Sequence, residues 1–320
     1  MSQVENNPFK YSDTNKRYYT YDYYLRNTYG EKCAKIPLEG GFTCPNIDGT
    51  KGRGGCIYCL GGSLAVTCEK VLPLKEQYLT GIEKLRQKWN VKKFIPYLQS
   101  FSNTYTSPAV LEKMLYEISS FEGVAEISIA TRADCLNDGI ISVLNKVSES
   151  IPITVELGLQ TSNDETAKII NRCHTYKEFE AGFFALRHGA PRVKIGVHII
   201  NGLPSETKED MLKTARDVGA LHPDFVKIHL LHVLRTTPLE KMFLSGTYIP
   251  MERDEYIKIV CSQLEILPPD IVIERLTGDG VEKDLVAPLW SKKKVTVIND
   301  IDKMLFSLGT WQGAQSTDEK

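Results

Sequence analysis

The sequence lacks any charge-free apolar run that approaches the roughly 18 residues of a membrane span. Its first residues, Met1 to Asn6, also lack the apolar stretch of a secretory signal peptide. No Gly/Ser-rich or Pro-rich linker, internal repeat or low-complexity tract interrupts the 320 residues. We therefore expect a cytoplasmic protein that does not enter a membrane and that builds a substantial core.

The chain also lacks an excess of charge of either sign. The 39 Lys and Arg residues balance 40 Asp and Glu residues, so the net charge of −1 gives no global attraction for nucleic acid. Two local stretches could still bind RNA: a Tyr-rich basic arm within residues 9–29, and the lysines at 292–294. The favoured interpretation is structural, with the tyrosines packed on the fold and the lysines in a solvated loop.

The cysteines do not form a disulfide framework. There are eight, unevenly spaced and without an export signal, which indicates reduced thiols and a metal cluster. Cys44, Cys56 and Cys59 have the spacing C-x11-C-x2-C. Three close thiolates can hold three irons of a cubane and leave the fourth iron free for a ligand, whereas an electron-transfer cluster needs a fourth cysteine. Tyr58 can shield such a cluster from water.

Structural zinc is the alternative for these cysteines, because a C-x2-C pair with outlying cysteines also binds zinc. Cys33 or Cys68 would then complete the ligand set. Zinc sites usually combine two tight pairs, and the second pair is missing here, so the spacing favours iron-sulfur. We expect the three other cysteines to be buried thiols: Cys135, Cys173 and Cys261.

After the segment 44–59 that carries the three spaced cysteines, called the cysteine loop below, short β-branched runs alternate with amphipathic helical stretches. This alternation predicts parallel strands joined by crossover helices. The expected strands are 35–38, 94–99, 126–131, 153–160, 193–200 and 224–231. The expected helices are 74–89, 108–119, 138–148, 175–188 and 208–221. Six such units fall short of the eight of a closed barrel, so the sequence predicts an α/β fold with a partial (β/α)6 TIM-like barrel whose site lies at the carboxyl ends of the strands.

Two helices have recognisable starts. Ser107 precedes Pro108, and Ser205-x-x-Lys208 precedes two acidic residues. The last part of the chain predicts a helix at 252–267, a strand at 271–276 and a helix at 295–308. We expect an arm at 1–34, the barrel at 35–240, and a C-terminal α/β extension at 241–320 that packs on the barrel.

With three cysteines after the first strand of a βα series, the chain resembles radical S-adenosylmethionine (SAM) enzymes. The long first gap resembles the branch that includes the radical SAM domain of the elongator catalytic subunit, and the chain resembles YhcC/YtqA-type proteins still more closely. The residues that carry this likeness are Gly40-Gly41-Phe42-Thr43-Cys44-Pro45-Asn46, Asp48-Gly49-Thr50, Gly52-Arg53-Gly54-Gly55-Cys56, and the segments 101–105, 156–161, 171–175, 201–207, 287–291 and 309–313.

The resemblance implies that Cys44, Cys56 and Cys59 bind a 4Fe-4S cluster whose unique iron binds SAM. One electron, from a donor such as a flavodoxin or ferredoxin, would then split SAM into methionine and a 5′-deoxyadenosyl radical that abstracts hydrogen from a substrate. It also implies SAM contacts for three residues. Gln160 and His198 stand where relatives contact the ribose, and Arg172 stands where relatives bind the carboxylate. Without a role in SAM binding, Gln160 would be a strand-end cap, His198 a core histidine and Arg172 a surface arginine.

Two segments depart from the family pattern. The Gly-Gly-Glu segment that meets the SAM amino group is replaced by Gln99-Ser100-Phe101-Ser102-Asn103, whose backbone carbonyls could replace it. At the third strand a relative's glutamate is replaced by Ala130, and either Arg132 or Asp134 could compensate or form a plain ion pair. The contacts to the amino group therefore stay unassigned.

The elongator likeness favours a tRNA base as the substrate, while a small metabolite or a peptide also fits a fold whose loops vary freely. A function of another class is a zinc-stabilised RNA-binding or scaffold protein without catalysis. That alternative explains the cysteines and the basic arm. It does not explain the alignment of Gln160 and Arg172 with the SAM-binding pattern.

Overall fold

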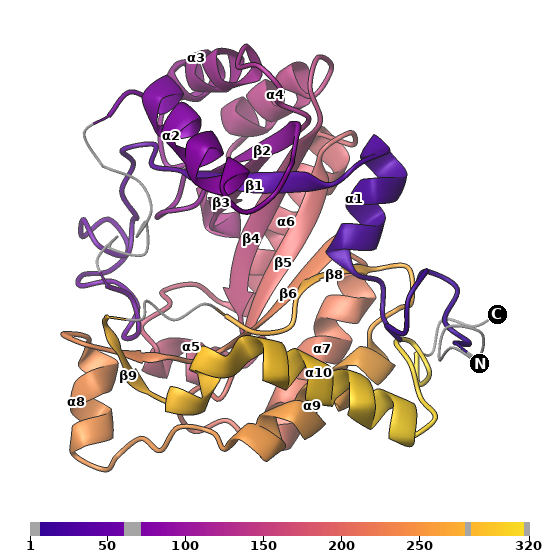
Figure 1. The fold of residues 1–320 in the computed structure, drawn as a ribbon. Helices are drawn as coiled ribbons and strands as arrows, with labels where there is room; N and C mark the ends of the chain where they lie inside the picture. Colours follow the sequence, from indigo (N-terminus) through magenta and orange to yellow (C-terminus); the bar gives the residue numbers. More distant parts are fainter. Residues whose placement is uncertain (1–6, 61–71, 279–282, 317–320) are drawn as a thin grey trace.

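The computed structural model describes residues 7–60, 72–278 and 283–316. Its centre is a curved parallel sheet with the strand order β1-β2-β3-β4-β5-β6-β8, and a two-stranded ribbon, β7-β9, lies beside it (Figure 1). The strands of the sheet are β1 (Cys33–Leu38), β2 (Lys93–Leu98), β3 (Ile127–Thr131), β4 (Ile153–Gln160), β5 (Lys194–Asn201), β6 (Phe225–Leu230) and β8 (Val272–Arg275). The ribbon pairs β7 (Val233–Leu234) with β9 (Leu285–Ala287) in antiparallel register.

The predicted partial barrel is confirmed, but its sheet has seven strands. The strand expected in the C-terminal extension, β8, pairs in parallel with β6 and becomes an edge of the same sheet. The sequence pattern located this strand but not its partner, because only tertiary pairing decides which edge it joins. The seventh strand brings Glu274 and Arg275 to the central cavity.

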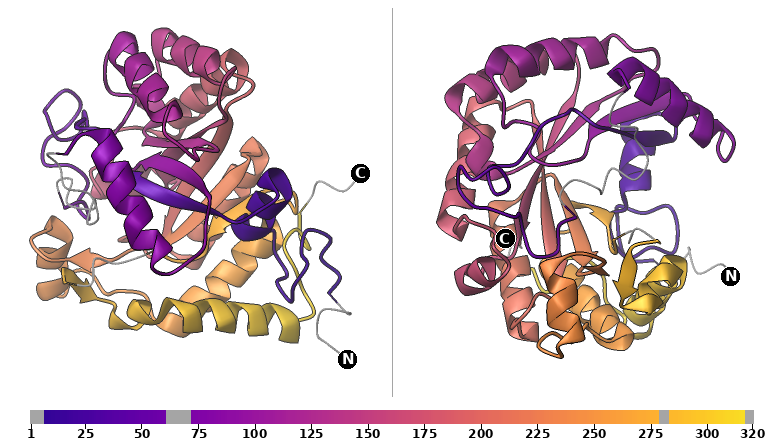
Figure 2. Two further views of the ribbon diagram at one scale, coloured as in Figure 1. Left: turned by 45° about the horizontal axis from the view of Figure 1, so that its top comes forward. Right: turned by 90° about the vertical axis from the view of Figure 1, so that its left-hand side faces the viewer.

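The helices cover the outer face of the sheet, as the right-hand view of Figure 2 shows. They are α1 (Tyr21–Tyr29), α2 (Leu74–Arg86), α3 (Pro108–Ser119), α4 (Asp138–Val147), α5 (Asp164–Ile169), α6 (Tyr176–Gly189), α7 (Lys208–Leu221), α8 (Pro238–Leu244), α9 (Arg253–Ile266) and α10 (Lys294–Ser307), with short 3-10 turns at Ala133–Cys135 and Leu289–Lys293. Among the described residues, none of these helices has the length and apolar character needed to span a bilayer.

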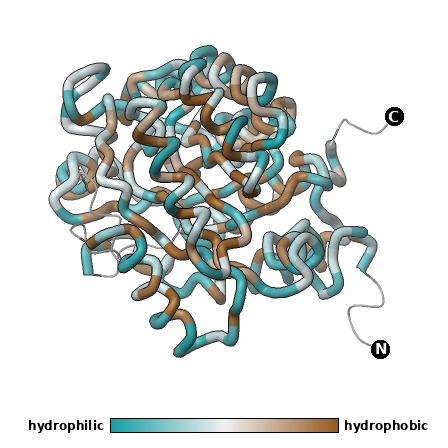
Figure 3. The backbone as a smooth tube through the Cα atoms, turned by 90° about the horizontal axis from the view of Figure 1, so that it is seen from above, coloured by the Kyte–Doolittle hydropathy of each residue, from teal (hydrophilic) through white to brown (hydrophobic). Residues whose placement is uncertain are grey.

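Side-chain patterning explains why this arrangement forms. Outward-facing strand residues such as Ile36, Leu98 and Val155 are fully buried under the helices. Seen from above, the helices alternate between hydrophobic and hydrophilic residues along the chain, as amphipathic helices do (Figure 3). At about 25 cal/mol per Å² of buried apolar surface, this interface between the sheet and the helices is the main favourable term in folding.

Capping side chains fix where the crossover helices begin. Ser107 accepts a hydrogen bond from the Val110 amide at the start of α3, as predicted. For α7 the cap is Thr207, which forms a reciprocal capping box with Asp210. Ser205, which the sequence suggested, instead adopts a left-handed conformation with φ of 68° in the loop before the helix.

The N-terminal arm packs on the sheet. Helix α1 contacts both edge strands, β1 and β8, so it spans the opening between them. Tyr24 is buried against Phe225, with ring centroids 5.1 Å apart, and Tyr18 is buried in the main core. The chain before α1 is fixed by a hydrogen bond of 2.7 Å from the Ile273 amide to the Tyr19 carbonyl. These contacts favour the structural interpretation of the tyrosines over an RNA-binding one. Lys292 and Lys293, in the second basic stretch, are exposed to solvent, as expected.

Glu206, in the loop between β5 and α7, allows a pH test of the fold. Burial raises the pKa of this carboxyl group to about 7, although Thr161 donates a hydrogen bond to it at 2.5 Å. A raised folded-state pKa gives stability that is complete below pH 4.5 and is lost as the pH rises through 7. We expect Glu206→Gln to remove this loss.

The measurement is the free energy of unfolding in urea at pH 5 and pH 8. Between these values the wild type should lose about 2 kcal/mol more than Glu206→Gln, after allowance for partial exposure of the carboxyl group. Parallel pH profiles of the two proteins would show that Glu206 ionises normally in the folded state.

Candidate active site

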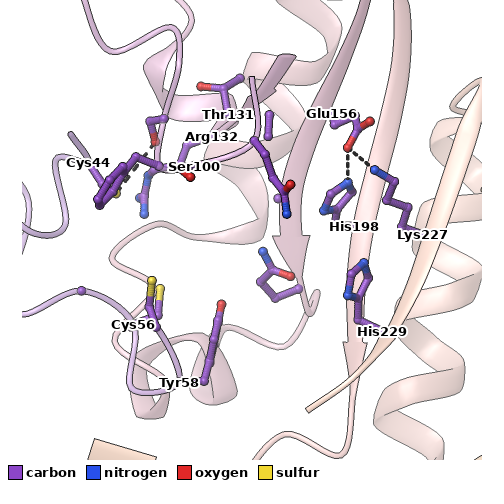
Figure 4. A pocket seen from close by; sticks show the side chains of 18 of the residues that line it. Cys44, Cys56, Tyr58, Ser100, Thr131, Arg132, Glu156, His198, Lys227 and His229 are labelled. Carbon is purple, nitrogen blue, oxygen red and sulfur yellow. Dashed lines mark hydrogen bonds and ion pairs between the residues drawn. The ribbon is translucent and has the colours of Figure 1, made fainter. Parts of the chain in front are cut away.

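A cavity of about 440 Å³ opens at the carboxyl ends of the strands. All six residues that the sequence nominated line it: Cys44, Cys56, Cys59, Gln160, Arg172 and His198. In Figure 4, His198 and His229 lie one below the other on one side of this cavity, and Cys44 and Cys56 lie on the other side. The structure therefore brings the predicted metal ligands and the predicted SAM contacts into one site.

The cysteine loop is a compact turn closed by its own backbone. The Ile47 amide donates to the Cys44 carbonyl at 2.8 Å, and the Cys59 amide donates to the Cys56 carbonyl at 2.9 Å. Gly54 and Gly55 have φ values of 80° and 74°, a left-handed conformation that other residues adopt only with strain. The glycines before Cys56 thus allow the chain to turn sharply into the C-x2-C pair.

Asn171, which follows α5, holds in place the long segment between Cys44 and Cys56. Its side-chain amide donates to the Arg53 carbonyl at 3.1 Å and to the Gly55 carbonyl at 2.7 Å. Asn171 has φ of 55°, a left-handed conformation that asparagine tolerates better than most residues. These two bonds fix the inserted residues against the barrel.

The C-terminal part of the chain supports the same loop. The Ile57 amide donates to the Ile170 carbonyl at 3.1 Å, and the Leu239 amide at the start of α8 donates to the Ile57 carbonyl at 3.0 Å. Ile57 and Tyr58 pack on a small apolar cluster that includes Leu239 and Ala287. The loop between the paired cysteines is therefore clamped between α5 and the segment that carries α8 and the β7-β9 ribbon.

The donors around the sulfur atoms fit an iron-sulfur cluster. Asn46 Nδ2 lies 3.5 Å from Cys56 Sγ, Ser102 Oγ lies 3.8 Å from Cys44 Sγ, and Arg172 Nη1 lies 3.9 Å from Cys56 Sγ. Side-chain N–H and O–H groups of this kind stabilise the negative charge on cluster thiolates.

A single metal ion such as zinc fits the described residues less well than an iron-sulfur cluster does. Within the ranges 7–60, 72–278 and 283–316, no group of three or more His, Cys, Asp or Glu is placed to hold one ion. Cluster thiolates need not converge on one point, because each binds a different iron. Cys33 packs with Ile95 and Phe225 at the amino end of β1, away from the cavity, so it is not a completing ligand. Cys68 lies outside the described residues.

The remaining cysteines are not all buried. Cys135 and Cys261 are buried, as predicted, and burial raises the pKa of each thiol to about 12. Cys173 is only half-buried, which corrects the prediction. It follows Arg172 in a left-handed turn with φ of 56°, which places its sulfur beside the cysteine loop, 3.3 Å from Asn171 Oδ1.

Arg172 is a buried residue of the site and not a surface arginine. Only 6% of it is exposed, and Nη2 donates to the Gly158 carbonyl. A Cβ atom at Gly158 would lie 2.9 Å from Arg172 Nη2, so the absence of a side chain there makes room for the guanidinium group. Arg172 Nε is buried without a partner among the described residues, which leaves a donor for a bound anion.

Gln160 ends β4 in a strained conformation. Its φ is 78°, and the register between β4 and β5 shifts between Gly158 and Gln160. A bulge at a strand end redirects a side chain, and here it places the Gln160 amide at the cavity. The strain favours a binding role over a simple strand-end cap, because sparsely populated backbone conformations cluster at functional sites.

His198 is oriented by a carboxylate. Its Nε2 donates to Glu156 Oε2 at 2.8 Å, so this nitrogen carries the proton and Nδ1 is left as an acceptor (Figure 4). Burial, followed by the positive charge of Lys227, lowers the pKa of His198, so the ring is neutral at pH 7. A neutral imidazole with an acceptor nitrogen is suited to a ribose hydroxyl.

Glu156 is the centre of a polar layer that sequence reasoning missed. Each of the seven strands contributes one side chain to it: Lys35, Tyr97, Ser128, Glu156, His198, Lys227 and Glu274. The sequence shows which strand residues face inward, because every second residue of a strand does so. It does not show that these seven inward-facing residues lie at the same height in the barrel, because that depends on the register between the strands.

The charges in this layer balance. Burial would raise the pKa of Glu156, but Lys227 and Lys35 hold it well below its ordinary value. Burial would lower the pKa of Lys35, and Glu156 and Glu274 raise it instead. For Lys227 burial prevails and lowers the pKa, although both glutamates contact it. Two lysines and two glutamates therefore form a floor of paired side chains beneath the cavity.

The two segments that depart from the family pattern also lie at the cavity. Phe101 has φ of 63° and turns the chain so that Ser102 reaches Cys44. Arg132 and Asp134 form a bidentate ion pair, with distances of 2.8 and 2.9 Å. Arg132 Nη1 also donates to the Arg172 carbonyl at 2.9 Å, so this pair supports the backbone of Arg172.

Comparisons with known proteins agree with this geometry. Residues 48–218 match the family described as the radical SAM superfamily, and residues 223–306 match the radical SAM C-terminal domain. The chain is 41% identical over 312 residues to the uncharacterized protein YtqA of Bacillus subtilis, covering 97% of this chain and 96% of YtqA. It is 29% identical to protein YhcC of Escherichia coli over 282 residues, covering 88% and 90% of the two chains.

More distant similarities extend over parts of longer proteins. The tRNA-2-methylthio-N(6)-dimethylallyladenosine synthase of Thermotoga petrophila is 27% identical over 161 residues, which are 50% of this chain and 36% of the synthase. The structure of Elp3 from the archaeon Methanocaldococcus infernus has the same fold, with a TM-score of 0.66 at 18% identity over 88% of this chain and 64% of the Elp3 chain. Together with the cysteine loop and the open parallel barrel, the family match establishes that this chain is a member of the radical SAM superfamily of enzymes.

Proposed function

We propose that this protein is a radical SAM enzyme in which Cys44, Cys56 and Cys59 hold a 4Fe-4S cluster and Gln160, Arg172 and His198 bind SAM. The observation that carries the proposal is one cavity lined by all six residues. When bound, such a cluster would supply the electron that splits the SAM sulfonium into methionine and a 5′-deoxyadenosyl radical, and this radical would take a hydrogen atom from the substrate.

The residues of the chain bind and orient SAM in this proposal. Arg172 offers its unpartnered Nε–H to the SAM carboxylate, beside the sulfur of Cys56. His198 Nδ1, held as an acceptor by Glu156, takes a hydrogen bond from a ribose hydroxyl, and the Gln160 amide can both donate and accept there. Tyr58 is half-buried beside the cysteine loop and limits access of water to the cluster side of the cavity.

For the substrate we propose a base in tRNA. Support comes from the name of the related Thermotoga synthase, which acts on tRNA, and from the likeness to elongator. A polar floor beneath the cavity suits a polar substrate group, because a fully apolar group would lie against charged side chains there. If the substrate proves to be a small metabolite, the tRNA proposal is wrong. A flavodoxin or ferredoxin is the proposed electron donor.

Anaerobic purification tests the proposal. The protein should be brown and contain about four iron and four sulfide per chain. With a strong reductant and SAM it should release 5′-deoxyadenosine, and incubation with bulk tRNA from a strain that lacks the gene should change the mass of one nucleoside. A colourless protein with one zinc would contradict the proposed cluster and its chemistry and would support the zinc-stabilised alternative. Normal cleavage of SAM without any nucleoside change would reject only the tRNA substrate.

A further inference from the structure

Asn46 lies in the cysteine loop between Cys44 and Cys56 and is fully buried. Its side-chain nitrogen has two acceptors, the Asn171 carbonyl at 2.5 Å and Cys56 Sγ at 3.5 Å. Of the side-chain donors found near the cysteine sulfurs, Asn46 makes the shortest contact, because Ser102 and Arg172 lie 3.8 and 3.9 Å from theirs.

The orientation of the Asn46 amide follows from its neighbours. If the oxygen and nitrogen were exchanged, the Asn46 carbonyl would face both a backbone carbonyl and a thiolate, which are acceptors and would repel it. The opposite atom, Oδ1, is buried without a partner among the described residues. Only the arrangement with the N–H group directed at Cys56 therefore satisfies the surrounding atoms.

The loop leaves room for this amide at Gly52. A Cβ atom at Gly52 would lie 2.2 Å from Asn46 Oδ1 and 2.7 Å from Cys173 Sγ, distances that packed atoms do not reach. The glycine thus holds space for Asn46 against the cysteine loop. The amide is therefore held by its hydrogen bond to the Asn171 carbonyl on one side and lies close to Gly52 on the other.

Reduction of an iron-sulfur cluster adds one negative charge, which spreads over its sulfur atoms. A hydrogen bond donated to a cluster sulfur stabilises the reduced state more than the oxidised state and raises the reduction potential. The effect is largest for a buried donor, because the surrounding dielectric constant is low.

We propose that Asn46 is a positioning residue that orients Cys56 and, through its N–H group, raises the reduction potential of the cluster. This inference rests on the proposed function, since it requires a cluster on the three cysteines. In this proposal, Asn46 makes the cluster easier to reduce, so that a cellular electron donor can transfer one electron to it.

The test is the reduction potential of the reconstituted cluster, measured without SAM by a redox titration followed by electron paramagnetic resonance. For Asn46→Leu, which keeps the size but removes the donor, the ratio of reduced to oxidised cluster at a fixed potential should fall about tenfold. For a one-electron couple this is a shift of about 59 mV to lower potential. Asn46→Ser, which keeps a shorter donor, should fall between Leu and the wild type.

Asn171→Gly is the matched control. It removes the bonds to Arg53 and Gly55 and keeps the left-handed backbone and the carbonyl that accepts from Asn46. Its cluster should be lost more quickly to a chelator, with an unchanged potential. Equal potentials for the wild type, Asn46→Leu and Asn46→Ser, at full iron content, would overturn the inference and leave the proposed function intact. A wild type that holds no cluster would overturn both.

Discussion

Cys56→Ala should abolish 5′-deoxyadenosine release and reduce bound iron and sulfide to background. Cys56 is 7% exposed and receives contacts from both Asn46 and Arg172, so its sulfur is the most enclosed of the three proposed ligands. Two thiolates cannot hold a cubane with one open iron in a stable way, and without the cluster no electron reaches SAM. The measurement is iron and sulfide content together with product formation under strict anaerobiosis.

Cys261→Ala is the matched control for this prediction. Cys261 is equally buried, but it packs under α10, where its Sγ lies 3.8 Å from the Ile301 carbonyl, far from the cavity lining. Its truncation should cost about 1 kcal/mol of stability and leave iron content and SAM cleavage within about twofold of the wild type. If Cys56→Ala kept its iron, or if both variants lost it equally, the ligand assignment would be wrong.

Glu156→Ala should destabilise the apoprotein by about 3–5 kcal/mol, because it leaves the buried Lys227 and the half-buried Lys35 to share Glu274. Glu156 is 1% exposed and accepts hydrogen bonds from five side chains on five strands. Removing one partner of a buried ion pair exposes the other charge to a low dielectric without compensation. The measurement is the free energy of unfolding in urea at pH 7.

Glu112→Ala provides the contrast. Glu112 also forms an ion pair with a lysine, at 2.6 Å, but Lys146 is 62% exposed there. Surface ion pairs contribute roughly 0–1 kcal/mol, so this variant should be close to the wild type. Glu156→Gln keeps the shape and several hydrogen bonds and should fall between the two alanine variants. Similar losses for Glu156→Ala and Glu112→Ala would contradict a buried charged layer.

Much of the fold could be predicted from the sequence because βα alternation is a local signal. The six strands and five crossover helices agree with the structure to within a few residues, since each has its own hydrophobic period and several have caps. The seventh strand was located but not paired, because β7, α8 and α9 separate β8 from β6 along the chain and the hydrophobic period of a strand does not identify its partner. The packing of the arm on the fold was expected, but its position across the barrel opening was not, since that position depends on contacts of Arg17 and Tyr19 with residues more than 200 positions away.

For the site, the sequence supplied residues that belong to a motif and missed those that act through geometry. Cys44, Cys56 and Cys59 stand out by spacing, and Gln160, Arg172 and His198 by their likeness to a known pattern. Glu156 begins the segment 156–161 of that likeness but received no role, and Lys227 and His229 belong to no motif; the three residues line one cavity. Burial and neighbouring cations lower the pKa of His229, whose ring stacks on that of His198 at 5.5 Å between centroids.

The arm that closes the barrel also bears on how the protein is made. The Gln312 amide donates to the Arg17 carbonyl at 2.9 Å, and the Ile273 amide donates to the Tyr19 carbonyl at 2.7 Å. Arg17 and Tyr19 therefore pair with residues that leave the ribosome more than 250 positions later. Until then the cysteine loop lacks its Leu239 support. For the proposed cluster, this order of synthesis implies that iron and sulfide would be inserted after the chain has folded.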